Sequence, residues 1–310
     1  MPPPLKPAAL RPGDCIRILS LASPVQEVRL QKGCEELTRL GFVPKCKRED
    51  VLACSGFFAG TTPARSGALK EALAETESRA IFCSRGGYGS NYLLEGLSVA
   101  LKSAKLLAGY SDVTSLQIFL WQKFRWVTLY APMVGAGLDK GAGAPEGYDR
   151  ESLLHAITET KQAWEINLMG GSLSHGVVEG TLLGGCLTLI ETALGTPWEL
   201  ETHGAILILE DRGMKPWQVD RALMHLKQAG KFRGVAGIIM GEFPECVAPE
   251  GSETVEDVAR RILTPMGIPI VWGAAVGHTP RPMLTLPLGV RARLSADGGT
   301  RLEILEPACS

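Results

Sequence analysis

The stretch KLLAGYSDVTSLQIFLWQKF, residues 105–124, joins a short apolar run to a longer helical pattern through a Gly-Tyr-Ser-Asp turn. The run over residues 105–108 is typical of a buried strand, and residues 114–124 have the length and apolar spacing of a helix. A strand that leads directly into a helix is the repeating unit of α/β proteins with parallel sheets. This stretch therefore predicts one such unit.

The same alternation continues on both sides of this unit. Apolar runs at residues 15–21, 80–83 and 127–130 predict further strands, and the patterns at 25–40 and 63–74 predict helices. The spacing predicts an α/β fold whose N-terminal part is a Rossmann-like parallel sheet with helices on both faces. Ligands of such sheets bind beyond the carboxyl ends of the strands.

The second half of the chain has a mixed pattern. The tail over residues 285–305 alternates apolar and polar residues and predicts a hairpin with its turn at Asp297-Gly298-Gly299. A change of pattern near residues 165–175 predicts an N-terminal domain, 1–168, and a smaller mixed α/β C-terminal domain, 169–310. The other predicted elements are strands at 205–209, 235–240 and 268–272, helices at 150–160, 217–230 and 255–263, and an apolar stretch at 179–194 whose second part is helical.

Composition excludes several classes of protein. Hydrophobic residues make up 45% and charged residues 21%, which is typical of a folded globular chain. A formal net charge of −1 without a basic block argues against a nucleic-acid partner, and no apolar run is long enough to span a membrane. The start at Met1 lacks a signal peptide. The eight cysteines form no Cys-x-x-Cys pair, so we expect reduced, buried thiols, no metal site and a cytoplasmic protein.

Glycine is in excess, with 36 glycines among 310 residues against an average of about 7%. Some of them mark turns and places where the backbone approaches a ligand closely. The stretch at residues 135–147 holds five glycines and predicts a loop, to which no function is assigned.

Glycines also follow the predicted strand at residues 80–83, in the loop Ser84-Arg85-Gly86-Gly87-Tyr88-Gly89-Ser90. Such glycines leave backbone N–H groups free to face a ligand or an oxyanion. The alternatives are a tight strand-to-helix turn and a phosphate-binding loop. The phosphate signature is weak, because its full spacing and the following acid are missing.

Ser111 lies in the turn Gly109-Tyr110-Ser111-Asp112 between a strand and a helix. A sharp turn of this kind exposes a nucleophilic serine in hydrolases and offers the next residue's N–H to an oxyanion. Val113 stands where the usual hydrolase motif has its last glycine. The alternative is that Ser111 or Asp112 caps the helix.

A serine nucleophile needs a base and an acid that orients it. The pair Glu210-Asp211 follows the strand at residues 205–209, either as catalytic acids or as solvated loop charges. Of the five histidines, His278 is the favoured base because it closes an apolar segment at a turn before Thr279-Pro280, and His175 is not excluded. The other three are His155, His203 and His225.

Short motifs occur along the chain at residues 11–14, 22–24, 85–89, 109–112, 180–187, 209–211, 220–221, 277–278 and 284–289. Taken together in this order, they resemble the LD-carboxypeptidase family, serine peptidases that include muropeptide LD-carboxypeptidases and microcin C immunity proteins. One departure is Tyr130-Ala131-Pro132, where relatives often have His-Gly-Pro. The resemblance covers nearly the whole chain.

The resemblance implies a Ser-Glu-His triad at the interface of two domains. Ser111 would be the nucleophile, His278 the general base and then acid, and Glu210 the carboxylate that orients the imidazole. The backbone N–H groups of Asp112 and Gly87 would form the oxyanion hole. No cofactor is implied, and family members are commonly homodimers. For Arg85 and for Asp220-Arg221 two roles stay open: contacts to the substrate, or structural ion pairs.

The function implied is that of a serine carboxypeptidase that cuts the L-to-D bond of a muropeptide. It would release terminal D-alanine from a tetrapeptide during peptidoglycan recycling. The close alternative is a microcin-immunity-like peptidase that acts on peptidyl-nucleotides. A third hypothesis, from another class, is a nucleotide-binding protein or dehydrogenase that uses the Gly86–Gly89 loop for phosphate.

Overall fold

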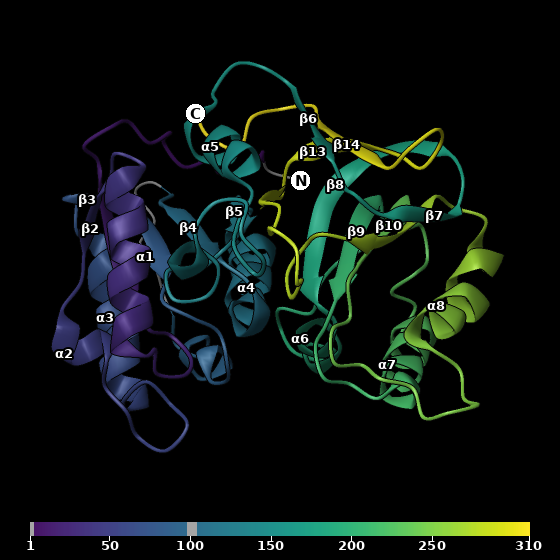
Figure 1. The fold of residues 1–310 in the computed structure, drawn as a ribbon, viewed down its shortest axis with the longest axis horizontal. Helices are drawn as coiled ribbons and strands as arrows, with labels where there is room; N and C mark the ends of the chain where they lie inside the picture. Colours follow the sequence, from purple (N-terminus) through teal and green to yellow (C-terminus); the bar gives the residue numbers. More distant parts are fainter. Residues whose placement is uncertain (1–2, 98–103) are drawn as a thin grey trace.

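Two β-sheets form the framework of the protein, which is described here from a computed structural model over residues 3–97 and 104–310 (Figure 1). The first sheet has the strand order β12-β5-β4-β3-β1-β2, and all its neighbouring strands are parallel except β12, which is antiparallel to β5. Its strands are β1 (Cys15–Leu19), β2 (Val43–Lys45), β3 (Ser78–Cys83), β4 (Leu106–Gly109), β5 (Thr128–Tyr130) and β12 (Leu286–Leu288).

Helices cover both faces of the first sheet, as predicted (Figure 1). Side chains of a strand alternate between the two faces. In β3, Phe82 belongs to the same buried cluster as Leu30 of α1, whereas Ile81 belongs to a second cluster with Leu69 of α3 and Leu116 of α4. The helices are α1 (Glu27–Arg39), α3 (Thr62–Ala74) and α4 (Thr114–Phe124).

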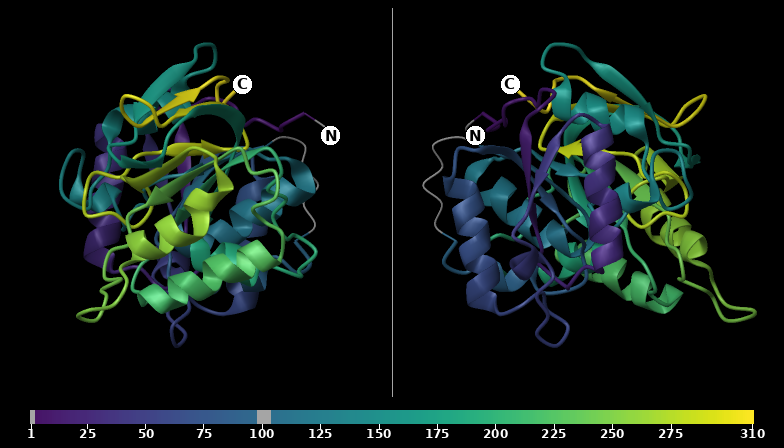
Figure 2. Two further views of the ribbon diagram at one scale, coloured as in Figure 1. Left: turned by 90° about the vertical axis from the view of Figure 1, so that its right-hand side faces the viewer. Right: turned by 60° about the vertical axis from the view of Figure 1, so that its left-hand side comes forward.

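The second sheet has the order β6-β14-β13-β8-β9-β10-β11-β7, with a parallel centre of β8 to β11 and antiparallel strands outside it. Figure 2 shows α7 and α8 side by side on its outer face. Its strands are β6 (Trp164–Asn167), β7 (Gly171–Ser174), β8 (Val177–Cys186), β9 (Ala205–Glu210), β10 (Gly237–Gly241), β11 (Ile270–Ala274), β13 (Arg291–Ser295) and β14 (Arg301–Ile304), and its helices are α6 (Leu187–Thr192), α7 (Pro216–Gln228) and α8 (Val255–Leu263).

The shorter elements connect these layers. The C-terminal residue lies beside the segment before β1, because the Ser310 N–H donates to the carbonyl of Pro7 at 2.9 Å. The α-helices among them are α2 (Arg48–Val51) and α5 (Arg150–Thr158), and the 3-10 helices are η1 (Ser90–Leu93), η2 (Ser111–Val113), η3 (Leu138–Lys140) and η4 (Thr264–Met266).

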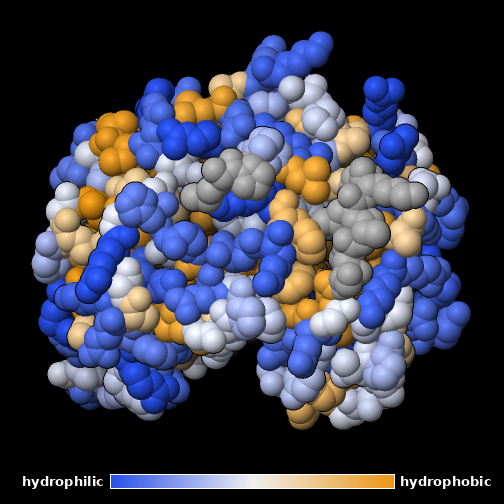
Figure 3. All heavy atoms as spheres, turned by 180° about the vertical axis from the view of Figure 1, so that it is seen from behind, coloured by the Kyte–Doolittle hydropathy of each residue, from blue (hydrophilic) through white to orange (hydrophobic). Residues whose placement is uncertain are grey.

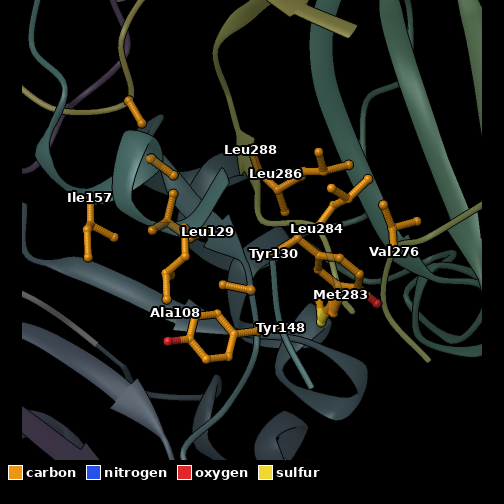
Figure 4. Packing of buried hydrophobic residues seen from close by; sticks show 14 of the residues in the cluster. Ala108, Leu129, Tyr130, Tyr148, Ile157, Val276, Met283, Leu284, Leu286 and Leu288 are labelled. Carbon is orange, nitrogen blue, oxygen red and sulfur yellow. The ribbon is translucent and has the colours of Figure 1, made fainter. Parts of the chain in front are cut away.

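An apolar core joins the two lobes, each lobe being one sheet with its helices. Figure 4 shows Leu129 of β5 and Leu286 of β12 in the same packed layer as Val276, which follows β11. All three side chains are at most 1% exposed. Because such cores are close-packed, the two lobes are held in one relative position, and so are the residues at their junction.

The α/β fold with a parallel sheet is confirmed, and one prediction about the C-terminal tail is wrong. The predicted hairpin turn is correct, since Ser295 pairs with Arg301 across it. The prediction that residues 285–305 form a single hairpin is wrong for β12, because that strand pairs with β5. The predicted helix in the second part of the stretch at 179–194 is confirmed, and its first part is a strand. The boundary at residue 168 stays a prediction, and β6, which precedes it, pairs with β14.

Within the described residues no helix is long and apolar enough to cross a membrane. Hydrophilic side chains cover most of the face drawn in Figure 3, and a notch in its lower edge separates the two lobes. All eight cysteines are free, but only Cys83, Cys186 and Cys309 are buried. The expectation that the thiols are buried is wrong for the exposed Cys54.

Candidate active site

A cavity of about 450 Å³ lies where the two lobes meet, and both halves of the chain line it. The first half contributes Gly86 and Gly87, which follow β3, and Ser111, which follows β4; the second half contributes Arg212, beyond β9, and His278, beyond β11. The cavity is therefore at the carboxyl ends of parallel strands, where α/β proteins bind their ligands.

Ser111 has a left-handed backbone, with φ of 62°. A residue other than glycine in this region costs of order 1–3 kcal/mol and persists where the surrounding structure holds it. The helix-cap alternative is wrong: the capping residues of η2 and α4 are Tyr110 and Val113, and neither makes a side-chain capping hydrogen bond. The sharp turn instead presents Ser111 to the cavity.

Gly86 packs directly against this serine. A Cβ atom on Gly86 would lie 2.8 Å from the Cβ and 2.9 Å from the Oγ of Ser111, closer than real Cβ atoms come. The same Cβ would lie 3.5 Å from the backbone nitrogen of Asp112. The backbone of Gly86 is therefore close to both the Ser111 side chain and the backbone nitrogen of Asp112.

The Asp112 side chain holds this glycine loop in place. Its carboxylate is 1% exposed and accepts hydrogen bonds from the backbone N–H groups of Ser90 at 2.8 Å and Gly89 at 3.3 Å. Arg65 of α3 donates to the carbonyl of Gly89 at 2.7 Å. Burial raises the pKa of Asp112, and the hydrogen bonds from Ser90 and Gly89 oppose the rise. The loop is thus fixed relative to Ser111.

His278 is bound to a fully buried carboxylate. Oε2 of Glu210 accepts from Nδ1 of His278 and from its backbone N–H, each at 2.9 Å, and Glu210 is 0% exposed. Because a carboxylate only accepts, the neutral imidazole carries its proton on Nδ1 and has its lone pair on Nε2. The ring of Tyr110 packs edge-on against the imidazole, with 5.1 Å between centroids.

The environment of His278 has opposing effects on its basicity. Burial lowers the pKa of the imidazole, whereas the charge of Glu210 and its hydrogen bond raise it. The net effect is a pKa above the usual 6.5. The carboxylate therefore stabilises the imidazolium that forms when a general base takes a proton.

Tyr130 is a further partner of Glu210. Its hydroxyl donates to Oε1, the carboxylate oxygen that does not contact His278, and the tyrosine is 0% exposed. The bond joins the end of β5 in the first lobe to the end of β9 in the second. The sequence marked Tyr130 only as a departure from the family tripeptide, so this contact was missed.

Gly277 allows the backbone of His278 to reach Glu210. Its φ is 65°, and a Cβ there would lie 2.3 Å from Cδ of Glu210. Part of the glycine excess thus has a specific cause at this cavity.

The other candidates from the sequence lie elsewhere. Asp211 is buried and accepts from the N–H and the hydroxyl of Thr188 at 2.8 and 2.7 Å, next to the start of α6. Since Glu210 is also buried, the reading of this pair as solvated loop charges is wrong. Asp220 pairs with Arg261 at 2.5 Å outside the cavity. Of the five histidines, only His278 lines the cavity.

The glycine-rich loop at residues 135–147, which had no assigned function, lines the cavity. The members involved are Gly135, Ala136, Gly137, Lys140, Glu146 and Gly147. The density of glycines was the one sequence signal that marked this loop.

A serine on a strand-to-helix turn that shares a cavity with a carboxylate-bound histidine is the layout of an α/β serine hydrolase. The models of the LD-carboxypeptidase N-terminal and C-terminal domains match residues 16–131 and 179–294. The chain belongs to the LD-carboxypeptidase family of peptidases.

Three relatives show the extent of the similarity. The chain is 32% identical to a Bacillus subtilis protein named "Probable murein peptide carboxypeptidase", over 94% of this chain and 91% of that protein. The structure of the microcin C7 self-immunity protein MccF in its wild-type apo state superposes with a TM-score of 0.89 at 26% identity, covering 99% and 100% of the two chains. For muramoyltetrapeptide carboxypeptidase from Oxalobacter formigenes, the TM-score is 0.82 at 26% identity, with 94% and 99% covered.

Proposed function

We propose that the protein is a serine-type LD-carboxypeptidase that hydrolyses the L-to-D bond of muropeptides and releases terminal D-alanine from a tetrapeptide. The observation that carries the proposal is that His278, bound through Nδ1 to buried Glu210, lines the same cavity as Ser111. The names of two of the relatives support the substrate class. A role in peptidoglycan recycling and a homodimeric state stay predictions from the resemblance, and a cytoplasmic location stays a prediction from the sequence composition.

In the proposed mechanism, Nε2 of His278 takes the proton of the Ser111 hydroxyl as Oγ attacks the carbonyl carbon of the L-residue. The C–N bond then breaks, and the protonated His278 returns the proton to the leaving amine of D-alanine. Water then attacks the acyl-enzyme while Nε2 of His278 takes one of its protons. His278 returns that proton to Oγ of Ser111 as the ester bond breaks, which releases the shortened peptide. Glu210 keeps the imidazole oriented and stabilises its charged form throughout.

The oxyanion of each tetrahedral intermediate would accept hydrogen bonds from the N–H groups of Asp112 and Gly87. Support comes from the packing of the glycine loop on Ser111 and from the position of Gly87 in the cavity wall. Each donor contributes about 3 kcal/mol to lowering the barrier in comparable enzymes. The fixed loop, tied down through Asp112 and Arg65, makes such donors available without reorganisation.

The test is the release of D-alanine from a tetrapeptide that ends in diaminopimelate-D-alanine. Ser111→Ala is expected to reduce the rate to background, because the acyl-enzyme cannot form. Ser252→Ala is the matched control, since Ser252 is exposed and its hydroxyl donates to the nearby carbonyl of Pro249. Near-normal release by Ser111→Ala would exclude the mechanism.

Action on peptidyl-nucleotides is the second candidate, and the close superposition on MccF favours it. It uses the same residues, so a side-by-side comparison of kcat/KM for a muropeptide and a peptidyl-nucleotide separates the two. The nucleotide-binding hypothesis has less support, because the Gly86–Gly89 loop packs on Ser111 and bonds to Asp112. Thermal stabilisation by NAD or ATP would revive it.

A further inference from the structure

Four cationic side chains line the cavity among the residues that the structure describes: Arg29, Arg85, Lys140 and Arg212. Within residues 3–97 and 104–310, two carboxylates line it with them, Glu146 and Glu245. Whether the cavity attracts an anionic group depends on which of these cations keeps an unbalanced charge.

Three of the four cations are already paired. Nε of Arg29 lies 2.7 Å from Oδ2 of Asp139, and Nζ of Lys140 lies 3.4 Å from Oε2 of Glu146. Arg212 forms an ion pair with Glu245. Their charges are neutralised within the protein.

Arg85 has no carboxylate partner anywhere in residues 3–97 and 104–310. Its hydrogen bond is a long one, from Nη1 to the carbonyl of Pro24 at 3.3 Å. The side chain is half-buried, so its charge is partly removed from water. A guanidinium has five N–H donors in a planar fork, and a single long bond to a neutral carbonyl leaves most of them available.

The position of Arg85 relates this charge to the nucleophile. It directly precedes Gly86, whose backbone packs on Ser111, in the loop that Asp112 and Arg65 hold in place. In a carboxypeptidase substrate, the free carboxylate is only one residue beyond the attacked carbonyl. A cation that lines the same cavity as the nucleophile is therefore suited to that carboxylate.

We propose that Arg85 binds the α-carboxylate of the residue that is released, an inference that rests on the proposed carboxypeptidase function. The planar guanidinium pairs with a carboxylate through two parallel hydrogen bonds. This contact sets the distance from the chain end to the scissile bond and restricts cleavage to the terminal residue. Arg85 is then a specificity-determining residue, separate from the groups that move protons.

The experiment compares kcat/KM for a tetrapeptide with a free C-terminal carboxylate and for the same tetrapeptide as its C-terminal amide. The wild type is expected to prefer the free acid strongly. Arg85→Gln is expected to lower kcat/KM for the free acid by about 10- to 100-fold, the loss typical of a charged hydrogen bond, and to leave the value for the amide nearly unchanged. Arg85→Lys keeps the charge but not the planar fork, so its kcat/KM for the free acid should lie between those of the wild type and Arg85→Gln.

Arg212→Gln is the control, because it removes a cavity-lining arginine whose charge Glu245 neutralises. It should affect both peptides equally. Binding of the two peptides to the Ser111→Ala variant, with and without Arg85→Gln, gives the same comparison without turnover. Thermal unfolding of each variant shows whether it is folded.

An equal loss for both peptides in folded Arg85→Gln, or no loss for the free acid, would overturn the assignment of Arg85 while the proposed function stands. Failure of the wild type to release D-alanine from either peptide would overturn the proposed function and this inference with it.

Discussion

Replacing Tyr130 with phenylalanine removes one hydroxyl from a hydrogen bond that joins the two lobes. Tyr130 and Glu210 are both 0% exposed, so water cannot replace the lost donor at Oε1. Hydrogen bonds to charged groups contribute about 1.5–3 kcal/mol. We therefore expect the free energy of unfolding to fall by about 2 kcal/mol.

The same value predicts a change in the unfolding temperature. An unfolding entropy of about 2.1 cal/mol/K per residue, over 310 residues, gives about 0.65 kcal/mol/K, so the midpoint should fall by about 3 °C.

Activity should change in a second, independent way. The hydrogen bond from the Tyr130 hydroxyl partly screens the charge of Glu210. Without this bond, the carboxylate interacts more strongly with His278. Since Glu210 raises the pKa of His278, the pKa of the imidazole should rise further in Tyr130→Phe. A general base must be neutral, so the acid limb of kcat/KM moves to higher pH. The measurement is the profile of kcat/KM over about pH 5 to 9.

Tyr148→Phe is a matched control. Tyr148 is also a buried tyrosine that donates to a buried glutamate, Glu36, at 2.6 Å, and Figure 4 shows its hydroxyl directed away from that of Tyr130. It should lose comparable stability with no shift of the acid limb. A normal midpoint and an unshifted limb in Tyr130→Phe would refute the reasoning, as would an equal shift in Tyr148→Phe.

Two further substitutions test the histidine and its surroundings. Glu210→Gln should lower kcat by on the order of 10³- to 10⁴-fold, as the loss of a triad carboxylate does elsewhere. It should also move the acid limb of the kcat/KM profile to lower pH, because burial then lowers the pKa of His278 without the opposing charge. An acid limb that stays in place would show that Glu210 does not set the basicity of His278. Gly277→Ala should destabilise the protein by about 3–5 kcal/mol, from left-handed backbone and a steric clash together, in urea unfolding. Gly298 has the same φ of 65°, and a Cβ added there would have no neighbouring atom within 4 Å. Gly298→Ala should therefore lower the free energy of unfolding by only about 1–2 kcal/mol. Equal losses at the two positions would contradict the assigned clash with Glu210.

Much of the fold could be predicted from local pattern. Hydrophobic period and turn residues are encoded within short segments, and the structure has α4 at Thr114–Phe124 and α8 at Val255–Leu263 with the predicted bounds. The candidate residues Ser111 and His278 were marked by their place at the ends of apolar runs. The motif order was sufficient to indicate the family.

Contacts between distant segments depended on the tertiary structure. No local pattern pairs β12 with β5, because their residues are far apart in the chain and meet only when the shared apolar core forms. For the same reason the bond from Tyr130 to Glu210, the loop at 135–147 in the cavity wall and the unpaired charge of Arg85 could not be derived from spacing. A sequence specifies which residue types are present and how each segment folds; which charge keeps a partner is decided only by packing in three dimensions.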